Sequence, residues 1–190
     1  NSLSELILKD KSLTRFSDLK AFGFWCRKRN LQRLAISYAS DNLIMGRGMV
    51  FHVSPSNVAL NFAYSLAFGM LAGNSNIVRL PTKAFDQVQV LIRLINQVLG
   101  QNEYNKIKNT ICLITYERCN KTSAELSLMA NARVIWGGDD TINIFRSYST
   151  KPRCVDIMFS NRYSAALIDP SAVKNLSDKA LLSLADKFFK

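Results

Sequence analysis

The sequence predicts an α/β fold, in which an open and mostly parallel sheet carries helices on both of its faces. Three observations lead to this prediction. Strand-like and helix-like stretches alternate from Gly48 onward, the strand-like stretches are continuous apolar runs, and the helix-like stretches are long enough to act as crossovers. Parallel strands need such crossover helices, and strands buried on both faces lack the polar alternation of an exposed sheet.

Residues 1–47 are predicted to form a helical segment that precedes the sheet. Apolar residues recur at helical spacing at Leu19, Phe22 and Cys26. The glycines of the segment MGRG, which ends at Gly48, then indicate a turn. We therefore predict two parts, the N-terminal helical segment and an α/β domain over residues 48–190.

Five strands and five helices are predicted in the second part. The strand-like runs are rich in β-branched and aromatic residues, and they cover residues 49–53, 76–80, 110–115, 133–136 and 164–168. The predicted helices cover residues 57–71, 85–99, 123–130, 141–147 and 171–189. Ser56 or Asn57 is expected to cap the first of these helices, and Gly100 ends the second.

The unit over residues 48–81 concentrates its polar side chains at the ends of its two strands. Ser54, Ser56 and Asn57 follow the first strand, and Arg79 lies at the end of the second. Ligands of open parallel sheets bind at the carboxyl ends of the strands. These residue types therefore indicate a site for an oxyanion or a phosphate.

Two interpretations of these residues stay open. The backbone N–H groups of residues 54–57 and the Asn57 amide can donate to an anion, helped by the dipole of the following helix, or Ser56 or Asn57 only caps that helix. Arg79 either binds a phosphate through two parallel hydrogen bonds or is a surface arginine with a solvated tip. His52, the only histidine, is expected to be packed and hydrogen-bonded rather than to act as a base.

The turn after the fourth strand, WGGDD, repeats the arrangement. Gly137 and Gly138 let a ligand approach the backbone closely. Asp139 or Asp140 can cap the helix that is predicted to begin at Thr141, although carboxylates there repel a phosphate placed directly on them. The sequence contains neither GxGxxG nor GxxxxGK followed by Ser or Thr, which excludes the usual Rossmann fingerprint and a P-loop.

The net charge of +11, from 25 Lys and Arg against 14 Asp and Glu, raises nucleic acid as a partner. The charges are dispersed, however, and the only dense cluster is Arg27, Lys28 and Arg29, followed by Arg33. No nucleic-acid-binding motif accompanies this cluster, so we predict no nucleic acid as a ligand. A basic chain also suits a phosphate-rich ligand such as a nucleotide or coenzyme A.

The four cysteines lie far apart and form no CxxC pair. We therefore predict no metal site and no disulfide framework, which is typical of a reducing, cytoplasmic setting. Cys26 and Cys112 lie among apolar residues and are expected to be buried thiols. The longest apolar run falls short of the about 20 residues of a membrane span. The chain begins at Asn1 without an initiator Met, which indicates a piece of a longer protein.

Four segments carry a resemblance to one family: HVSPSN, LAGNSNIVR, VIWGGDDTI and RCVDIMFSNRYSAALID. In this order they resemble the aldehyde dehydrogenase superfamily, and more closely the LuxC-type acyl-CoA reductases, over the chain from about Phe22 to its end. The resemblance implies a Rossmann-like domain that binds a nicotinamide cofactor over residues 48–190. It also implies an enzyme that reduces a fatty acyl thioester to an aldehyde through an acyl-cysteine intermediate.

The resemblance assigns roles to the residues around the first two strands. Asn57 matches the asparagine whose amide helps to form the oxyanion hole of the family. Ser54, Pro55 and Ser56 would line the cofactor cleft. Arg79 matches a position, lysine in most aldehyde dehydrogenases, that contacts the adenosine end of the cofactor.

The resemblance also implies a preference for NADPH over NADH. Relatives that prefer NAD carry a glutamate three residues after the Arg79 position, and here that residue is Thr82. Without the carboxylate, a 2′-phosphate meets no repulsion. Gly137 and Gly138 correspond to the turn beneath the pyrophosphate of the cofactor, and Asp139 follows them in the same site.

The chain departs from the family at two catalytic positions. The general-base glutamate falls near Met158 or Phe159, and the nearest carboxylate, Asp156, is displaced, which favours reduction over hydrolysis to an acid. The nucleophilic cysteine of the family lies beyond Lys190, and Cys154 lacks its sequence context. The catalytic domain is therefore expected to lie outside this chain, which alone would be inactive.

The implied partners are an acyl-CoA or acyl-protein thioester substrate and an acyl-transfer or synthetase subunit, with a homo-oligomer in the full-length form. Two other interpretations stay open. One is a different CoA-acylating aldehyde dehydrogenase or a glutamyl-phosphate reductase relative. The other is a non-catalytic basic α/β module. Binding to DNA that depends steeply on salt, without binding of NADPH, would favour this second interpretation.

Overall fold

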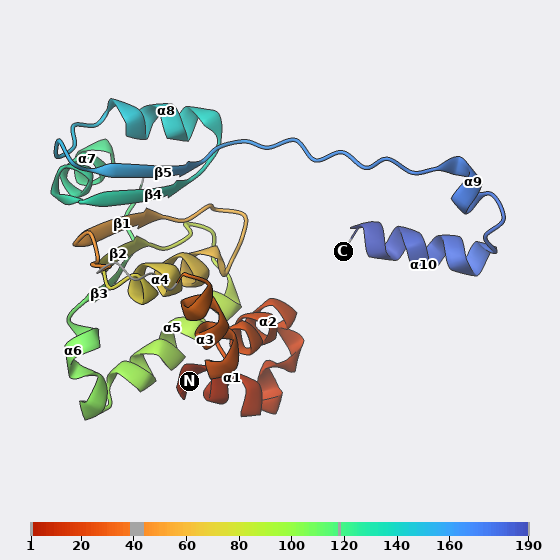
Figure 1. The fold of residues 1–190 in the computed structure, drawn as a ribbon, viewed down its shortest axis with the longest axis horizontal. Helices are drawn as coiled ribbons and strands as arrows, with labels where there is room; N and C mark the ends of the chain where they lie inside the picture. Colours follow the sequence, from red (N-terminus) through yellow and green to blue (C-terminus); the bar gives the residue numbers. More distant parts are fainter. Residues whose placement is uncertain (1, 39–43, 118, 190) are drawn as a thin grey trace.

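The computed structural model describes residues 2–38, 44–117 and 119–189 of the chain. Within these residues, five strands form one parallel sheet in the order β3-β2-β1-β4-β5, and helices cover both of its faces (Figure 1). The predicted α/β class, with an open parallel sheet and helices ahead of it, is confirmed.

The strands are β1 (Met49–Val53), β2 (Ser75–Arg79), β3 (Ile111–Ile114), β4 (Ala132–Trp136) and β5 (Val155–Phe159). The first four predicted strands are confirmed, each to within one residue at either end. The predicted strand at residues 164–168 is wrong, since residues 160–169 have no regular structure and β5 takes the fifth place. Asp156 interrupts the apolar run of β5, and its charge obscured this strand in the sequence.

One face of the sheet is covered by α4 (Asn61–Leu71) and α5 (Asp86–Leu99). Four short elements come before the sheet: α1 (Ser2–Lys9), η1 (Lys11–Arg15), α2 (Ser17–Trp25) and α3 (Lys28–Ser37). The core on this side contains the fully buried side chains of Ile7, Leu19, Phe62, Val78 and Leu91. Burial of each such side chain contributes about 1.5–3 kcal/mol, which holds these helices against the sheet.

The opposite face is covered by α7 (Asn120–Met129) and α8 (Asp139–Ser147), around a smaller core that includes Phe51 and Ile135. Two short helices, η2 (Asn102–Tyr104) and α6 (Asn105–Lys108), connect α5 to β3. The chain therefore places one pair of crossover helices on each face, as expected for a doubly wound sheet.

Beyond β5 the chain runs as an extended segment to α9 (Pro170–Val173) and α10 (Asp178–Phe189), which lie apart from the sheet (Figure 1). The predicted helix over residues 171–189 is thus wrong in part, because it is interrupted between α9 and α10. Two separate caps explain the interruption. The Asp169 carboxylate accepts a hydrogen bond from the Ser171 N–H at 2.9 Å, and the Ser177 hydroxyl accepts one from Ala180 at 3.4 Å.

Candidate functional site

The order of the strands creates one topological switch point, the strand reversal, which is the place where the chain changes the side of β1 on which it adds strands. From β1 the chain moves through β2 to β3 on one side, and it then crosses to β4 and β5 on the other side of β1. Ligands of open α/β sheets bind at the carboxyl edge beside such a reversal. In this chain the loops that follow β1 and β4 meet this condition, and they hold the predicted residues Ser54, Asn57, Gly137 and Gly138.

Buried polar atoms without a hydrogen-bond partner gather at the same edge. Within the described part of the chain there are five such side-chain atoms: Ser54 Oγ, Asn61 Oδ1, Arg79 Nε, Trp136 Nε1 and Ser127 Oγ. The first four lie just after β1, at the start of α4, and at the last residues of β2 and β4. Buried polar atoms are nearly always hydrogen-bonded, so these unpaired atoms mark a place where a polar ligand or water can bind.

Arg79 is half-buried beside the end of β1. Its guanidinium lies 4.4 Å from the centre of the Tyr116 ring and donates to the Tyr116 carbonyl at 3.4 Å. The backbone N–H of Ser54 donates to the Arg79 carbonyl at 3.3 Å. Among the described residues no carboxylate forms an ion pair with Arg79. Its charge is therefore held in place and available to an anion.

The loop after β1 differs from its prediction in one respect. The helix α4 begins at Asn61, after Leu60, so neither Ser56 nor Asn57 caps it. Ser54 and Pro55 are half-buried, whereas Ser56 and Asn57 are exposed. The reason is a turn at residues 59–60, which separates the polar residues from the helix. The Asn57 amide therefore stays accessible to a ligand instead of being used within the helix.

The turn after β4 fits tightly against α8. A Cβ atom on Gly137 would lie 2.8 Å from the Thr141 Cβ, so only glycine allows this helix to start so close to the strand. The predicted helix start is two residues late, and the predicted Asp cap is wrong. Asp139 is the first helical residue, and its carboxylate accepts a hydrogen bond from the Asn161 N–H at 3.2 Å. Thr82 lies exposed in the loop after β2.

An aromatic pair at this edge was missed in the sequence. The Trp136 and Phe159 rings stack at 3.7 Å between centres and 7° between planes, from the paired ends of β4 and β5. The Arg162 guanidinium lies 5.9 Å from the centre of the Phe159 ring. Placing the fifth strand at residues 155–159 would have aligned these two aromatic residues. The pair extends the candidate site toward β5.

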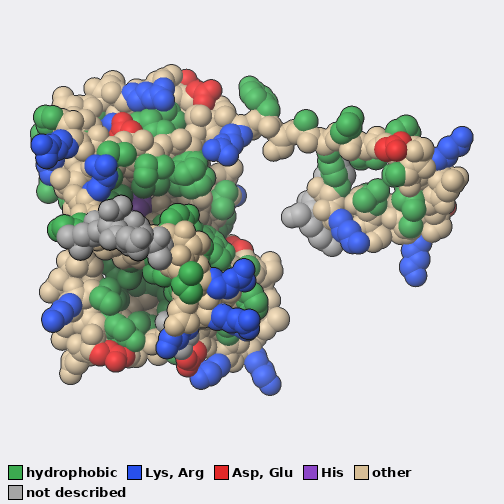
Figure 2. All heavy atoms as spheres, viewed as in Figure 1, with side chains coloured by type: hydrophobic (Ala, Val, Ile, Leu, Met, Phe, Trp, Pro, Cys, Tyr) green, Lys and Arg blue, Asp and Glu red, His purple; other side chains and the backbone are tan. Residues whose placement is uncertain are grey.

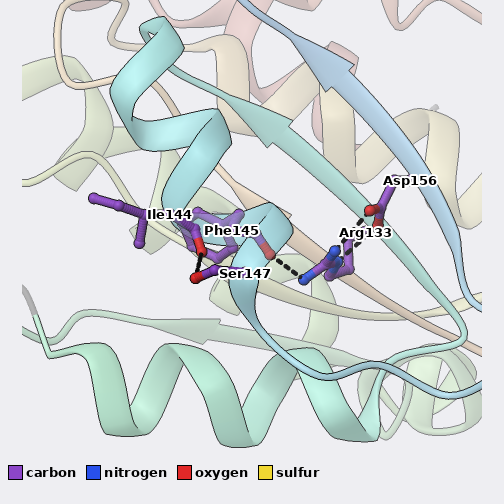
Figure 3. A network of polar contacts seen from close by, with 5 residues as sticks. All are labelled: Arg133, Ile144, Phe145, Ser147 and Asp156. Carbon is purple, nitrogen blue, oxygen red and sulfur yellow. Dashed lines mark hydrogen bonds and ion pairs between the residues drawn. The ribbon is translucent and has the colours of Figure 1, made fainter.

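Asp156, the nearest carboxylate to the expected general-base position, belongs to a structural ion pair (Figure 3). Arg133 is 2% exposed and donates to both Asp156 oxygens, at 2.7 Å from Nε and 2.6 Å from Nη2. Its third contact, from Nη1, is 2.8 Å to the Phe145 carbonyl at the end of α8. With both oxygens occupied, Asp156 joins β4, β5 and α8 and does not serve as a free base.

The cysteines differ in their surroundings. Cys119, exposed in the segment after β3, has its pKa lowered by the hydrogen bond that Thr122 donates to its sulfur, whereas the other two shifted thiols have a raised pKa. Burial raises the pKa of the Cys26 thiol to about 12, and burial followed by the charge of Asp156 raises the pKa of Cys154. The prediction of a buried Cys26 is confirmed, but that of a buried Cys112 is wrong. Cys112 lies on the edge strand β3 and faces away from α5. Among the described residues no group of His, Cys, Asp and Glu could hold a metal ion.

His52 is packed and hydrogen-bonded, as predicted. Its Nε2 lies 3.0 Å from Asn76 Oδ1 and its Nδ1 lies 2.8 Å from Ser65 Oγ. Because the Asn76 amide group donates to the Asn74 carbonyl, Asn76 Oδ1 is an acceptor, which places the imidazole proton on Nε2. The ring thus connects β1, β2 and α4 in its neutral form.

The burial of His52 makes stability depend on pH. Burial lowers the pKa of His52 from 6.5 to about 4, so the unfolded chain binds more protons between these values. Stability is fully present above pH 6.5 and falls as pH decreases, by about 2 kcal/mol between pH 7.5 and pH 5. Urea unfolding at both pH values measures this loss. In the His52→Gln variant, the decrease in the free energy of unfolding between pH 7.5 and pH 5 should be much smaller. An equal decrease in the variant and the unmodified chain would contradict the prediction.

The fold and this edge define the class of the protein, a doubly wound α/β protein with a ligand site at its strand reversal. A scan of family models matches residues 2–188 to the family described as Acyl-CoA reductase (LuxC). The chain therefore belongs to the LuxC family of acyl-CoA reductases, which are oxidoreductases. A comparison with curated proteins found no match. Within the described residues, no helix has the length and apolar character needed to cross a membrane.

Proposed function

We propose that this chain is the cofactor-binding part of an NADPH-dependent reductase that converts a fatty acyl thioester to an aldehyde through an acyl-cysteine. The observation that carries the proposal is the cluster of four unpaired buried polar atoms at the strand reversal, in a chain of the acyl-CoA reductase family. NADPH, when bound, would supply the hydride. The residues of this chain bind it, orient it and support the oxyanion.

The donors at the strand reversal fit a dinucleotide with a 2′-phosphate. A pyrophosphate would lie beside the Gly137 and Gly138 backbone, displaced from the Asp139 and Asp140 carboxylates in the first turn of α8. Ser54, Pro55 and Ser56 form the wall on the β1 side. Arg79, which forms no ion pair with any described residue, presents its charge to the adenosine phosphate, and Thr82 brings no repulsive carboxylate.

The remaining catalytic roles divide between this chain and the sequence that follows it. The exposed Asn57 amide is suited to stabilise the oxyanion of a thioester under attack. Cys26 and Cys154 have a raised pKa, which makes them unsuited to be the nucleophile, and Cys112 and Cys119, like them, lack the sequence context of the family nucleophile. We therefore place the nucleophile beyond Lys190. The pairing of Asp156 with Arg133 leaves no free carboxylate near the base position, which supports reduction rather than hydrolysis.

The proposal also covers the substrate, the partners and the location of the longer protein. Its substrate would be an acyl-CoA or an acyl-protein thioester, and the net charge of +11 suits the phosphates of the former. A subunit that activates or transfers the acyl group would be a partner, and the full-length protein would form a homo-oligomer in the cytoplasm. All four thiols are free, which is compatible with a reducing compartment.

Cofactor preference tests the proposal. Titration of the chain, followed by nicotinamide fluorescence, should show NADPH binding at least about tenfold more tightly than NADH, since a charge-assisted hydrogen bond contributes about 1.5–3 kcal/mol. Thr82→Glu should reverse the preference by repelling the 2′-phosphate. Thr82→Val, which adds no charge, is the matched control and should keep it. Equal affinity for both cofactors would reject the NADPH assignment.

A further inference from the structure

The helix α3 and the turn before it form a basic segment without acidic residues. Residues 19–40 of the sequence contain no carboxylate, and their cations are Lys20, Arg27, Lys28, Arg29 and Arg33. The last four lie at the N-cap of α3 or within it, and none of them forms an ion pair with a described residue. Figure 2 shows Lys and Arg side chains gathered over the half of the body that holds the N-terminal helices. The charge of this segment is therefore available to an anionic partner.

The cations of α3 share the outward face of the helix with one exposed isoleucine. At about 100° per residue, Lys28, Arg29 and Arg33 fall within an arc of about 140°. Ile36 falls inside the same arc and is 73% exposed. The two leucines of α3 fall on the opposite side and are half-buried, so the helix rests on the body through them. The outward face thus surrounds an aliphatic side chain with positive charge.

Two exposed aromatic side chains lie at the ends of this helix. Phe24, next to the last residue of α2, is 54% exposed, and the Arg27 guanidinium lies 4.2 Å from the centre of its ring. The Asn30 amide donates to the Phe24 carbonyl at 2.9 Å, which joins the end of α2 to the start of α3. Tyr38, at the other end of α3, is 72% exposed. Basic residues with exposed aromatic and aliphatic side chains are typical of helices that lie in a membrane surface.

We propose that the outward face of α3 binds the surface of an anionic lipid bilayer. Its cations would contact the phosphates of the headgroups, and Ile36 would enter the boundary between headgroups and acyl chains. The helix would lie on the membrane and would not span it. Charge complementarity supports this partner, since a cluster of about four to eight basic residues on an amphipathic helix is typical of binding to anionic lipids.

The exposed isoleucine favours a lipid surface over nucleic acid. Cations would serve either partner, but an aliphatic side chain gains affinity where it leaves water for an apolar phase. The helix α10 lacks this combination. It exposes Leu182 at 70%, but its two lysines are balanced by two aspartates. The proposal uses no residue of the candidate cofactor site and is independent of the cofactor assignment.

Co-sedimentation of the chain with lipid vesicles tests the proposal. Vesicles of equal parts phosphatidylcholine and phosphatidylglycerol should bind the chain at least about tenfold more tightly than vesicles of phosphatidylcholine alone, since each basic residue near an anionic surface contributes a factor of about five. The double variant Arg29→Gln/Arg33→Gln should weaken binding to the anionic vesicles about 25-fold. The matched control, Lys179→Gln/Lys187→Gln on α10, also removes two charges and should change binding by less than about threefold.

Ile36→Gln keeps every charge and separates lipid insertion from attraction between charges. It should weaken binding to the anionic vesicles at least about threefold, with NADPH affinity and the thermal unfolding midpoint unchanged because the side chain is exposed. The proposal is overturned if the unmodified chain does not bind the anionic vesicles at about 1 mM lipid, or if the α10 control loses as much affinity as Arg29→Gln/Arg33→Gln. It is also overturned if Ile36→Gln binds as the unmodified chain does, or if duplex DNA binds more tightly than the vesicles at equal phosphate concentration.

Discussion

Asp156→Ala is expected to lower the free energy of unfolding by about 1–3 kcal/mol, the cost of leaving the buried Arg133 guanidinium without its carboxylate partner. Arg133 is 2% exposed, and its guanidinium has only the Phe145 carbonyl as a remaining partner once the carboxylate is gone. The Asp156 side chain is 34% exposed, so water that enters the space left by the carboxylate offsets part of the loss. Chemical denaturation at pH 7 measures the loss.

Two further variants separate the buried charge from other effects of the substitution. Asp140→Ala removes an exposed carboxylate from the first turn of α8 and should cost less than about 1 kcal/mol. The double variant Arg133→Met/Asp156→Ala removes both charges and should recover at least half of the loss. If the double variant is less stable than Asp156→Ala, the loss does not come from an unpaired Arg133.

Arg79→Glu is expected to weaken NADPH binding by at least about 100-fold, which corresponds to about 2.7 kcal/mol. The substitution removes a charge-assisted contact, which contributes about 1.5–3 kcal/mol, and places a negative charge next to a phosphate. Arg79 is half-buried and fixed by the Tyr116 ring, so its charge is held at the carboxyl edge. Fluorescence titration measures the change.

Arg93→Glu on α5 is the matched control, because it reverses the charge of an exposed arginine away from the carboxyl edge. Arg93→Glu should change the NADPH affinity by less than threefold at physiological ionic strength, where the Debye length of about 8 Å screens long-range interactions between charges. An equal loss in Arg79→Glu and Arg93→Glu would mean that overall charge, and not the position of Arg79, governs binding. Thermal unfolding of both variants checks that the fold is retained.

The sheet was predictable from the sequence because its central strands are buried on both faces. The runs at β1, β2 and β4 are short and rich in β-branched and other apolar residues, so their positions follow from composition and length. β5 was not predictable in this way, because Asp156 is neutralised by Arg133, a residue 23 positions away along the chain. The apolar segment at residues 164–168 has the pattern of a strand, yet it finds no neighbouring strand to pair with among the described residues.

The candidate site was predictable as a set of loops but not as a set of contacts. The turn after β1 is polar and the turn after β4 carries two glycines, and parallel topology brings both to one edge. The start of α4 was placed four residues early, because Ser56 and Asn57 are good capping residues that the turn at residues 59–60 separates from the helix. The Trp136–Phe159 stack depends on strand pairing, and the unpaired Asn61 oxygen depends on packing. Neither has a local signal in the sequence.

The central claim is that the strand reversal binds the nicotinamide cofactor, and an amide map of the isotopically labelled chain during NADPH titration tests it most directly. Saturable shifts are expected at Ser54, Arg79, Gly137 and Gly138, where the unpaired polar atoms and the open turn lie. The amide of Gly73, at the amino edge, should stay unchanged. Shifts confined to the amino edge, or no saturable shift at any amide, would contradict the claim.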